Sequence, residues 1–121
     1  MLVIAVIEEA KALDHIDEIA ATPGIDVLFI GTSDLSFSLG FRGKQGHPRL
    51  EKAISRIVQA GKKHGKVLGR PARTPEDIKS FQEQGFLFFQ APTVLNFMAA
   101  GAEQFLHPSS TAHRGKSART K

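Results

Sequence analysis

The sequence predicts an α/β fold in which four strands, each followed by a helix, form a parallel sheet. Two observations support this prediction. Four short apolar segments are near-continuous rather than alternating, as in strands that are buried on both faces of a parallel sheet. Amphipathic helical segments separate them, and parallel strands joined in this way are connected by right-handed crossovers. A chain of 121 residues is long enough for one such domain with a modest core.

The strand-like segments are short and rich in Val, Ile, Leu and Phe. We expect strands at residues 2–7, 27–30, 67–68 and 86–89. The third segment is the shortest of the four.

The first two helices follow from apolar residues at helical spacing. After the first strand these residues are Ala10, Leu13, Ile16 and Ala20. The helix before the third strand has a clearer apolar stripe, made by Leu50, Ile54, Ile57 and Val58. His47 and Pro48 begin this helix, and the segment from Gly61 to Gly65 ends it.

The last two helices have recognisable ends. Thr74 is the expected N-cap of the third helix, Pro75 takes its first position, and acidic residues fill its first turn. Gly85 ends this helix. A fourth helix follows from Thr93 to Leu106, and we expect it to bury Val94, Phe97, Met98 and Phe105.

Four βα units are half of a (β/α)₈ barrel, which typically contains about 250 residues. An open four-stranded sheet is the alternative, and its edge strands would be exposed. We expect residues 1–106 to form the partial domain and residues 107–121 to form a separate tail.

The formal net charge of +4 comes from this tail. Residues 1–106 contain 12 Lys or Arg and 12 Asp or Glu, so their charges cancel. The tail has no apolar residue beyond alanine and one proline, and we expect it to be solvated and disordered. A weak electrostatic contact with phosphate or a membrane surface is the alternative for the tail. Nucleic acid is not an expected partner of the neutral body.

The sequence contains no cysteine, which excludes disulfides, thiolate zinc sites and cysteine nucleophiles. The longest apolar run is too short to span a membrane. Glu8, Glu9 and Asp14 argue against a signal peptide. We therefore expect a cytoplasmic enzyme or binding domain without a membrane partner.

Two carboxylates, Glu8 and Asp34, follow neighbouring strands of the predicted sheet. The carboxyl ends of parallel strands meet at one edge, so both side chains can reach the same opening. Two oxygen ligands with room for water and substrate suit Mg²⁺ or Mn²⁺ better than zinc. Two alternatives remain. Glu8 and Glu9 could lie in the first turn of a helix, where acidic side chains interact favourably with the helix dipole, and Asp34 could cap the segment that begins at Leu35.

The turn Gly31-Thr32-Ser33-Asp34 could form a small anion nest. Glycine lets the backbone approach a ligand, and the amides of Ser33 and Asp34 could donate to a carboxylate. An ordinary tight turn explains the same residues.

The segment VIEEAKALDHIDEIAATPGIDVLFIGTSDLSFSLG resembles the HpcH/HpaI-type pyruvate aldolase/citrate lyase family, which includes macrophomate synthase. The similarity continues through GHPRLEKAISRIVQAGKKHGKVLG to about Leu106. It corresponds to the C-terminal half of the family's TIM barrel. The family's first four βα units, with a substrate-binding arginine and an acid–base histidine, would lie upstream.

The resemblance implies a divalent-metal-dependent carbon–carbon lyase, an aldolase or decarboxylase of pyruvate-derived 2-keto acids. Catalysis in the family passes through a metal-bound enolate, with Mg²⁺ or Mn²⁺ as the expected ion. Glu8 and Asp34 match the metal-binding carboxylates, and Gly31 with the amides of Ser33 and Asp34 matches the turn that holds the substrate carboxylate. Family members are commonly hexamers, so a homo-oligomer is expected.

The basic candidates at the opening are Arg70, Arg73 and Arg42. Arg70 follows the predicted third strand, so we expect it at the same face and in contact with substrate; an exposed or paired arginine is the alternative. We assign no acid–base residue, because His15 and His64 fall on or beyond helices.

Two other functions are compatible with the sequence. A catalytically inactive half barrel could serve as a self-associating structural or binding module, because unpaired strand edges favour pairing. A small adaptor could use the basic tail.

Overall fold

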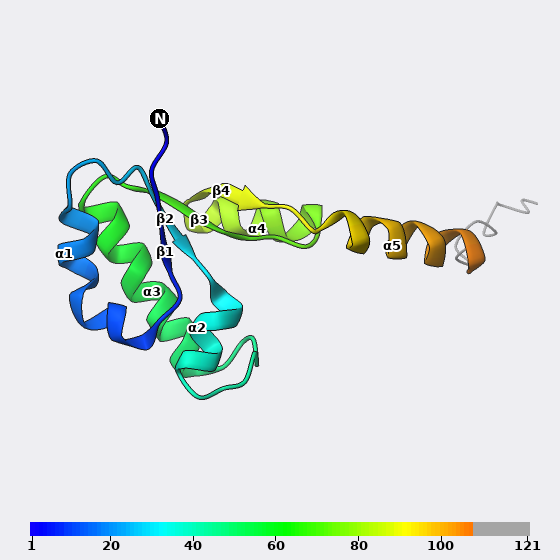
Figure 1. Ribbon diagram of the computed structural model, residues 1–121, viewed down its shortest axis with the longest axis horizontal. Helices are drawn as coiled ribbons and strands as arrows, with labels where there is room; N and C mark the ends of the chain where they lie inside the picture. The colour runs from blue at the N-terminus through cyan, green and yellow to red at the C-terminus, as the bar shows by residue number, and fades with distance from the viewer. Residues whose placement is uncertain (108–121) are drawn as a thin grey trace, which may run out of the picture. The chain divides into compact units, whose positions relative to one another are not determined.

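The computed structural model describes residues 1–107 (Figure 1). Within them the chain forms four strands, five α-helices and one 3₁₀ helix. In chain order these are β1 (Ile4–Ile7), η1 (Ala10–His15), α1 (Ile16–Ala21), β2 (Val27–Ile30), α2 (Thr32–Ser38), α3 (Pro48–Lys63), β3 (Val67–Pro71), α4 (Pro75–Gln84), β4 (Phe86–Gln90) and α5 (Val94–Leu106).

The four strands form one parallel sheet whose order, β1-β2-β3-β4, is the order of the chain. The register places Ile7 beside Ile30, so the segments that follow β1 and β2 leave the sheet at neighbouring points. The predicted α/β fold with a parallel sheet is therefore confirmed.

The chain separates into two compact units, Met1–Ala91 and Pro92–Lys121. The first unit contains the sheet and helices α1 to α4. The described part of the second unit contains α5. The predicted domain boundary after residue 106 stays a prediction, and the predicted tail lies, apart from His107, outside the described residues.

The predicted ends of the two best-marked helices are confirmed. His47 caps α3, and its Nδ1 accepts a hydrogen bond of 3.2 Å from the backbone amide of Arg49. Thr74 and Asp77 form a reciprocal capping box at the start of α4. Gly85 ends α4 with φ of +100°, a left-handed conformation that glycine adopts without a steric penalty.

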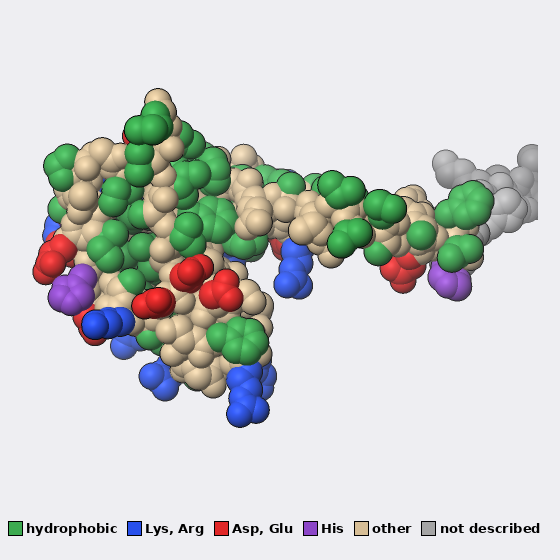
Figure 2. All heavy atoms as spheres, in the orientation of Figure 1, with side chains coloured by type: hydrophobic (Ala, Val, Ile, Leu, Met, Phe, Trp, Pro, Cys, Tyr) green, Lys and Arg blue, Asp and Glu red, His purple; other side chains and the backbone are tan. Residues whose placement is uncertain are grey.

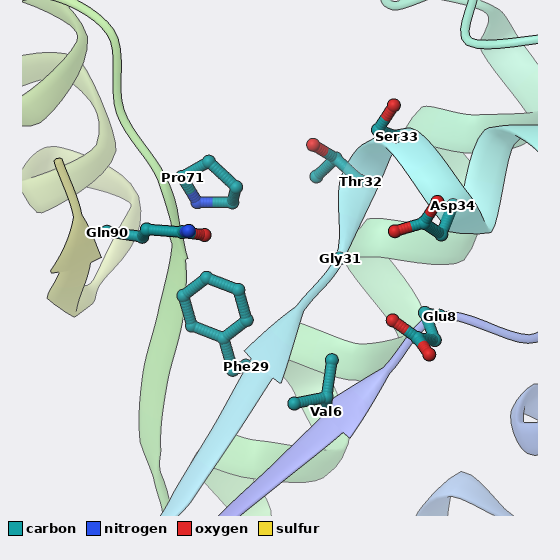
Figure 3. Close-up of a pocket in the computed structure, with 9 residues that line it drawn as sticks. All are labelled: Val6, Glu8, Phe29, Gly31, Thr32, Ser33, Asp34, Pro71 and Gln90. Atoms are coloured by element: carbon teal, nitrogen blue, oxygen red, sulfur yellow. The ribbon is translucent and has the colours of Figure 1, made fainter. Parts of the chain in front are cut away.

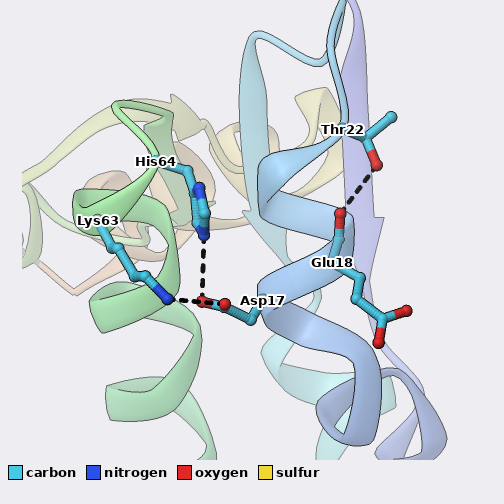
Figure 4. A network of polar contacts seen from close by, with 5 residues as sticks. All are labelled: Asp17, Glu18, Thr22, Lys63 and His64. Atoms are coloured by element: carbon cyan, nitrogen blue, oxygen red, sulfur yellow. Dashed lines mark hydrogen bonds and ion pairs between the residues drawn. The ribbon is translucent and has the colours of Figure 1, made fainter.

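The core lies where the sheet packs against its helices. Its largest fully buried side chains come from the strands and from α2 and α3: Val27, Leu28, Ile30, Leu35, Ser36, Leu50, Ile57, Leu68 and Phe86. Helices α1 and α3 run side by side on this face (Figure 1). Asp17 on α1 joins them through Lys63 at 2.8 Å and His64 at 3.1 Å, which follow one another at the end of α3 (Figure 4).

The outer strands of the sheet are not buried on both faces, which corrects an expectation from the sequence. Every residue of β2 is buried, as expected for a central parallel strand. In β1, however, Ile4 is 38% exposed and Val6 is 52% exposed. Figure 2 shows hydrophobic side chains gathered over this strand. Within the described residues the helices of the first unit cover one face of the sheet. The other face of β1 therefore stays open, although this strand is continuously apolar.

Several predicted boundaries were wrong. The first strand begins at Ile4 rather than at residue 2, and the third continues to Pro71 rather than ending at Leu68. Glycine and proline are weak strand formers, so the second half of β3 could not be recognised in the sequence. Its pairing with β4 keeps these residues in the sheet. The first helix is divided into η1 and α1, and α2 begins at Thr32, before the segment expected from Leu35.

The expected burial along the last helix is also wrong. Val94, Phe97, Met98 and Phe105 on α5 are between 57% and 85% exposed. Thr93 does cap this helix through Asn96, so its start was predicted correctly. Apolar periodicity identifies the face of a helix that favours burial, but it does not identify the surface that covers that face.

No helix among the described residues is both long and apolar enough to cross a membrane.

Candidate functional site

A pocket opens at the carboxyl ends of the strands, with a cavity volume of about 340 Å³ (Figure 3). All four strands contribute to it, directly or through the residues that follow them. Its polar lining consists of Glu8, Thr32, Ser33, Asp34 and Gln90, and the rest of the lining is Val6, Phe29, Gly31 and Pro71. This is the edge at which ligands bind in parallel α/β folds.

Glu8 reaches the pocket because β1 ends one residue before it. Ile7 is buried and pairs with Ile30, and the amide of Gly31 donates a hydrogen bond of 3.1 Å to the carbonyl of Ile7. This pairing places Glu8 next to Gly31. A further hydrogen bond of 2.8 Å, from the amide of Ala10 to the hydroxyl of Ser38, attaches the segment after Glu8 to α2.

Gly31 leaves the space that the Glu8 side chain occupies. A Cβ atom at position 31 would lie 3.1 Å from Cβ of Glu8, 3.4 Å from its Oε2 and 3.7 Å from Cγ1 of Val6. The first of these distances is shorter than an ordinary van der Waals contact, so the absence of a side chain at Gly31 gives the carboxylate its room.

Asp34 lies in the first turn of α2, which Gly31 caps without a side-chain hydrogen bond. The amides of Ser33 and Asp34 belong to this turn, so no carbonyl of their own helix accepts from them. The hydroxyl of Ser36 donates a hydrogen bond of 2.6 Å to the carbonyl of Ser33 and holds the turn from the buried side. Figure 3 shows the carboxylates of Glu8 and Asp34 on the Gly31 side of the pocket.

Glu8 and Asp34 are the two carboxylates of the pocket lining, and carboxylate oxygen is the ligand type that a hard divalent cation takes. Among residues 1–107 no group of three or more His, Cys, Asp or Glu side chains lies close enough together to hold a metal. The pocket therefore offers two protein oxygen ligands, with open space for water and substrate. Mg²⁺ is usually bound in this way, through one or two carboxylates while several waters remain. A zinc site with three protein ligands would need a further donor.

Arg70 does not line this pocket. It lies within β3 and faces an adjoining pocket of about 290 Å³, which shares Thr32, Ser33 and Pro71 with the first. Its guanidinium lies 3.7 Å above the ring centre of Phe81. Burial lowers the pKa of Arg70 below its ordinary value, and the nearby acids Glu51 and Asp77 oppose this effect. Its contact with substrate stays a prediction.

Arg73 lines the same adjoining pocket, whereas Arg42 lines neither pocket. No histidine among residues 1–107 lines either of them. His64 and His15 contact acidic residues of α1.

Sequence reasoning missed several residues of the site. Gln90, the last residue of β4, lines the pocket. The signal that identified Glu8, a polar residue at the end of an apolar strand, could have identified Gln90 as well. Phe29 and Pro71 also line it, but neither has a sequence signal of its own. Both were absent from the expected site because alternation along a short strand does not show which face is turned toward a pocket.

Residues 1–98 match the HpcH/HpaI aldolase/citrate lyase family. Over 100 residues the chain is 38% identical to a 2-dehydro-3,6-dideoxy-6-sulfogluconate aldolase of Pseudomonas putida, covering 83% of this chain and 39% of the relative. It is 40% identical over 82 residues to a 5-keto-4-deoxy-D-glucarate aldolase of Klebsiella pneumoniae, covering 68% of this chain and 32% of the relative.

A solved structure of a HpcH/HpaI aldolase/citrate lyase family protein from Burkholderia cenocepacia J2315 is similar to this chain. The TM-score is 0.85 at 33% sequence identity, and the match covers 89% of this chain and 42% of that protein. The chain thus spans between 32% and 42% of the length of these three proteins.

Proposed function

The chain belongs to the HpcH/HpaI aldolase/citrate lyase family, and from this premise we propose that it carries the metal-binding part of a carbon–carbon lyase. The proposed reaction is the aldol cleavage or decarboxylation of a pyruvate-derived 2-keto acid, with Mg²⁺ or Mn²⁺ as the ion. One observation carries the proposal: Glu8 and Asp34 follow neighbouring strands and line one pocket, with Gly31 between them.

Each group of residues has a distinct proposed task. Glu8 and Asp34 hold the cation, and Gly31 allows the keto acid to approach the backbone. The amides of Ser33 and Asp34 donate hydrogen bonds to the substrate carboxylate. When bound, a divalent ion supplies Lewis-acid stabilisation of the negative charge that develops on a keto oxygen.

The apolar part of the lining supports the same assignment. Val6, Phe29 and Pro71 line the pocket together with the polar residues and offer a surface for the carbon chain of a small acid. Excluding water there strengthens the electrostatic interactions of the carboxylates. Since Arg70 faces the adjoining pocket, any contact that it makes with substrate is with a part remote from the cation.

We also propose that the four βα units are half of a (β/α)₈ barrel, with residues 1–106 as the partial family domain. Four parallel strands in sequential order are half of the strands of such a barrel. The location in the cytoplasm and assembly into a homo-oligomer are parts of this proposal.

The test of the lyase proposal is oxaloacetate decarboxylation by the purified chain, with the rate of the metal alone subtracted. Pyruvate release that requires Mn²⁺ and disappears in Glu8→Gln and in Asp34→Asn would support it. Glu9→Gln is the matched control, because it removes the same charge from a neighbouring residue that does not line the pocket. Release that survives in both site variants would refute the site assignment.

A second candidate function is an inactive, self-associating half barrel. The observation that favours it is the exposed apolar surface of the outer strands, where Val6 is 52% exposed and Leu87 is 70% exposed. Exposed apolar patches and unpaired strand edges promote association. This candidate predicts no turnover and a dimer or larger species in sedimentation velocity; a monomer would refute it.

A further inference from the structure

The pocket that adjoins the proposed cation site has a cationic lining of its own. Arg70 from β3 and Arg73 from the loop before α4 both line it, with Ser33 at the boundary of the two pockets. Its only acidic lining residue among those described is Asp77. The described lining therefore carries two positive charges and one negative charge.

Arg70 is stacked on an aromatic ring and has an unsatisfied hydrogen-bond donor. Its guanidinium stacks on Phe81, with 3.7 Å between its central carbon and the ring centroid, and also lies 5.3 Å from the centroid of Phe86. Its Nε is buried, and within residues 1–107 no atom accepts a hydrogen bond from it. A buried donor without a partner costs free energy, and the guanidinium keeps its other N–H donors for a ligand in the pocket that Arg70 lines.

The acidic residues nearby do not neutralise this cation by direct pairing. Within residues 1–107 no ion pair includes Arg70 or Arg73. Oδ2 of Asp77 instead accepts hydrogen bonds from the amides of Arg73 and Thr74, at 2.9 Å and 3.1 Å. These bonds engage the carboxylate in the start of α4. The guanidinium of Arg70 is partly buried, which lowers its pKa, and a partly desolvated charge gains from an anionic partner.

We propose that this second pocket is a binding site for a compact oxyanion, a carboxylate or a phosphate, held by Arg70 and Arg73. The planar guanidinium presents parallel N–H donors that match the oxygens of these two groups. Stacking on Phe81 restricts its rotation and so reduces the entropy lost on binding.

The position of the site suggests how such a group would arrive. The two pockets share Thr32, Ser33 and Pro71, two of which Figure 3 shows at the start of α2. An acid with a second anionic group could occupy both pockets at once, whereas a free phosphate would occupy the second alone. The oxyanion chemistry is the same in both cases, and it does not depend on lyase activity.

The experiment measures inorganic phosphate binding to the full chain by isothermal titration calorimetry at constant ionic strength. We expect saturable binding that is weakened roughly tenfold in Arg70→Gln and in Arg73→Gln. Lys79→Gln is the matched control: it removes one positive charge from an exposed position on α4 that does not line the pocket. Arg73 is exposed, so its replacement decides the question if Arg70→Gln fails to fold.

Two organic acids distinguish the sources of the oxyanion. If Arg70→Gln weakens the binding of 2-oxoglutarate but not of pyruvate, the site receives the second carboxylate of a ligand that spans both pockets. If it weakens the binding of phosphate alone, the site receives a separate phosphate group. The proposal is overturned if neither phosphate nor 2-oxoglutarate binds saturably, or if Lys79→Gln weakens binding as much as the two arginine variants.

Discussion

Replacing Gly31 by alanine tests whether this position is glycine for the sake of the Glu8 carboxylate. Its φ of −74° is one that any residue adopts, so the backbone itself does not require glycine. The added Cβ would lie 3.1 Å from Cβ of Glu8, while ordinary contacts begin at 3.4 Å. Glu8 or the strand that carries it must therefore move by at least the difference, 0.3 Å.

A displacement of this size matters more for the site than for the fold. Rotation of the Glu8 side chain does not move its Cβ, so a small backbone shift has to relieve the contact; because Glu8 is exposed, we expect a stability loss of only about 1 kcal/mol. A binding constellation, however, has to be held within about 0.5 Å of its productive geometry, and a shift of at least 0.3 Å at Glu8, together with reorientation of its carboxylate away from the added methyl group, takes up most of that tolerance. We therefore expect Gly31→Ala to weaken Mn²⁺ binding, and any metal-dependent turnover, by about 10- to 100-fold.

Two measurements separate these effects: Mn²⁺ titration followed by electron paramagnetic resonance, and urea unfolding. Gly101→Ala is the matched control, because a Cβ added at Gly101 on α5 meets nothing within 4 Å. Mn²⁺ binding that is equally strong in Gly31→Ala, in Gly101→Ala and in the unchanged chain would refute the reasoning. Failure of the unchanged chain to bind Mn²⁺ would refute it as well.

Three further predictions concern the stability of the first unit, measured as the free energy of unfolding in urea. Hydrogen bonds from Lys63 and His64 lower the pKa of Asp17, so its stabilisation is present above the unfolded-state pKa and is lost as the pH falls through the lower folded-state pKa. Stability should thus decrease less between about pH 5 and about pH 2 in Asp17→Asn than in the unchanged chain; an equal decrease would contradict this. Thr74→Ala removes the side-chain cap of α4 and should cost about 1 kcal/mol, and no loss would show that the cap is dispensable. Leu28→Ala creates a cavity at a fully buried position and should cost about 2–5 kcal/mol; a loss below 1 kcal/mol would mean that the core closes around it.

The local features of the fold could be predicted because each depends on a few neighbouring residues. Thr74 and Gly85 mark the ends of α4 through backbone requirements that are written in the sequence. The common opening for Glu8 and Asp34 was also predictable, because the ends of parallel strands gather at one edge whatever the detailed packing.

What only the tertiary structure decided is the direction of side chains and the partners of exposed surfaces. Arg70 was expected beyond the end of the third strand, but β3 continues to Pro71, and its pairing with β4 sets the direction in which each side chain points. Arg70 therefore faces Phe81 of α4, while Pro71 faces the pocket with Glu8.

β1 and α5 illustrate the same difference between what the sequence determines and what the tertiary structure decides. The sequence alone determined that α5 is an amphipathic helix, begun by Thr93, and that β1 is an apolar strand. It did not determine that Phe97 and Val6 are more than half exposed in the structure. Burial depends on which surfaces meet in space, and the periodicity of a segment records its own preference for an apolar neighbour without specifying that neighbour.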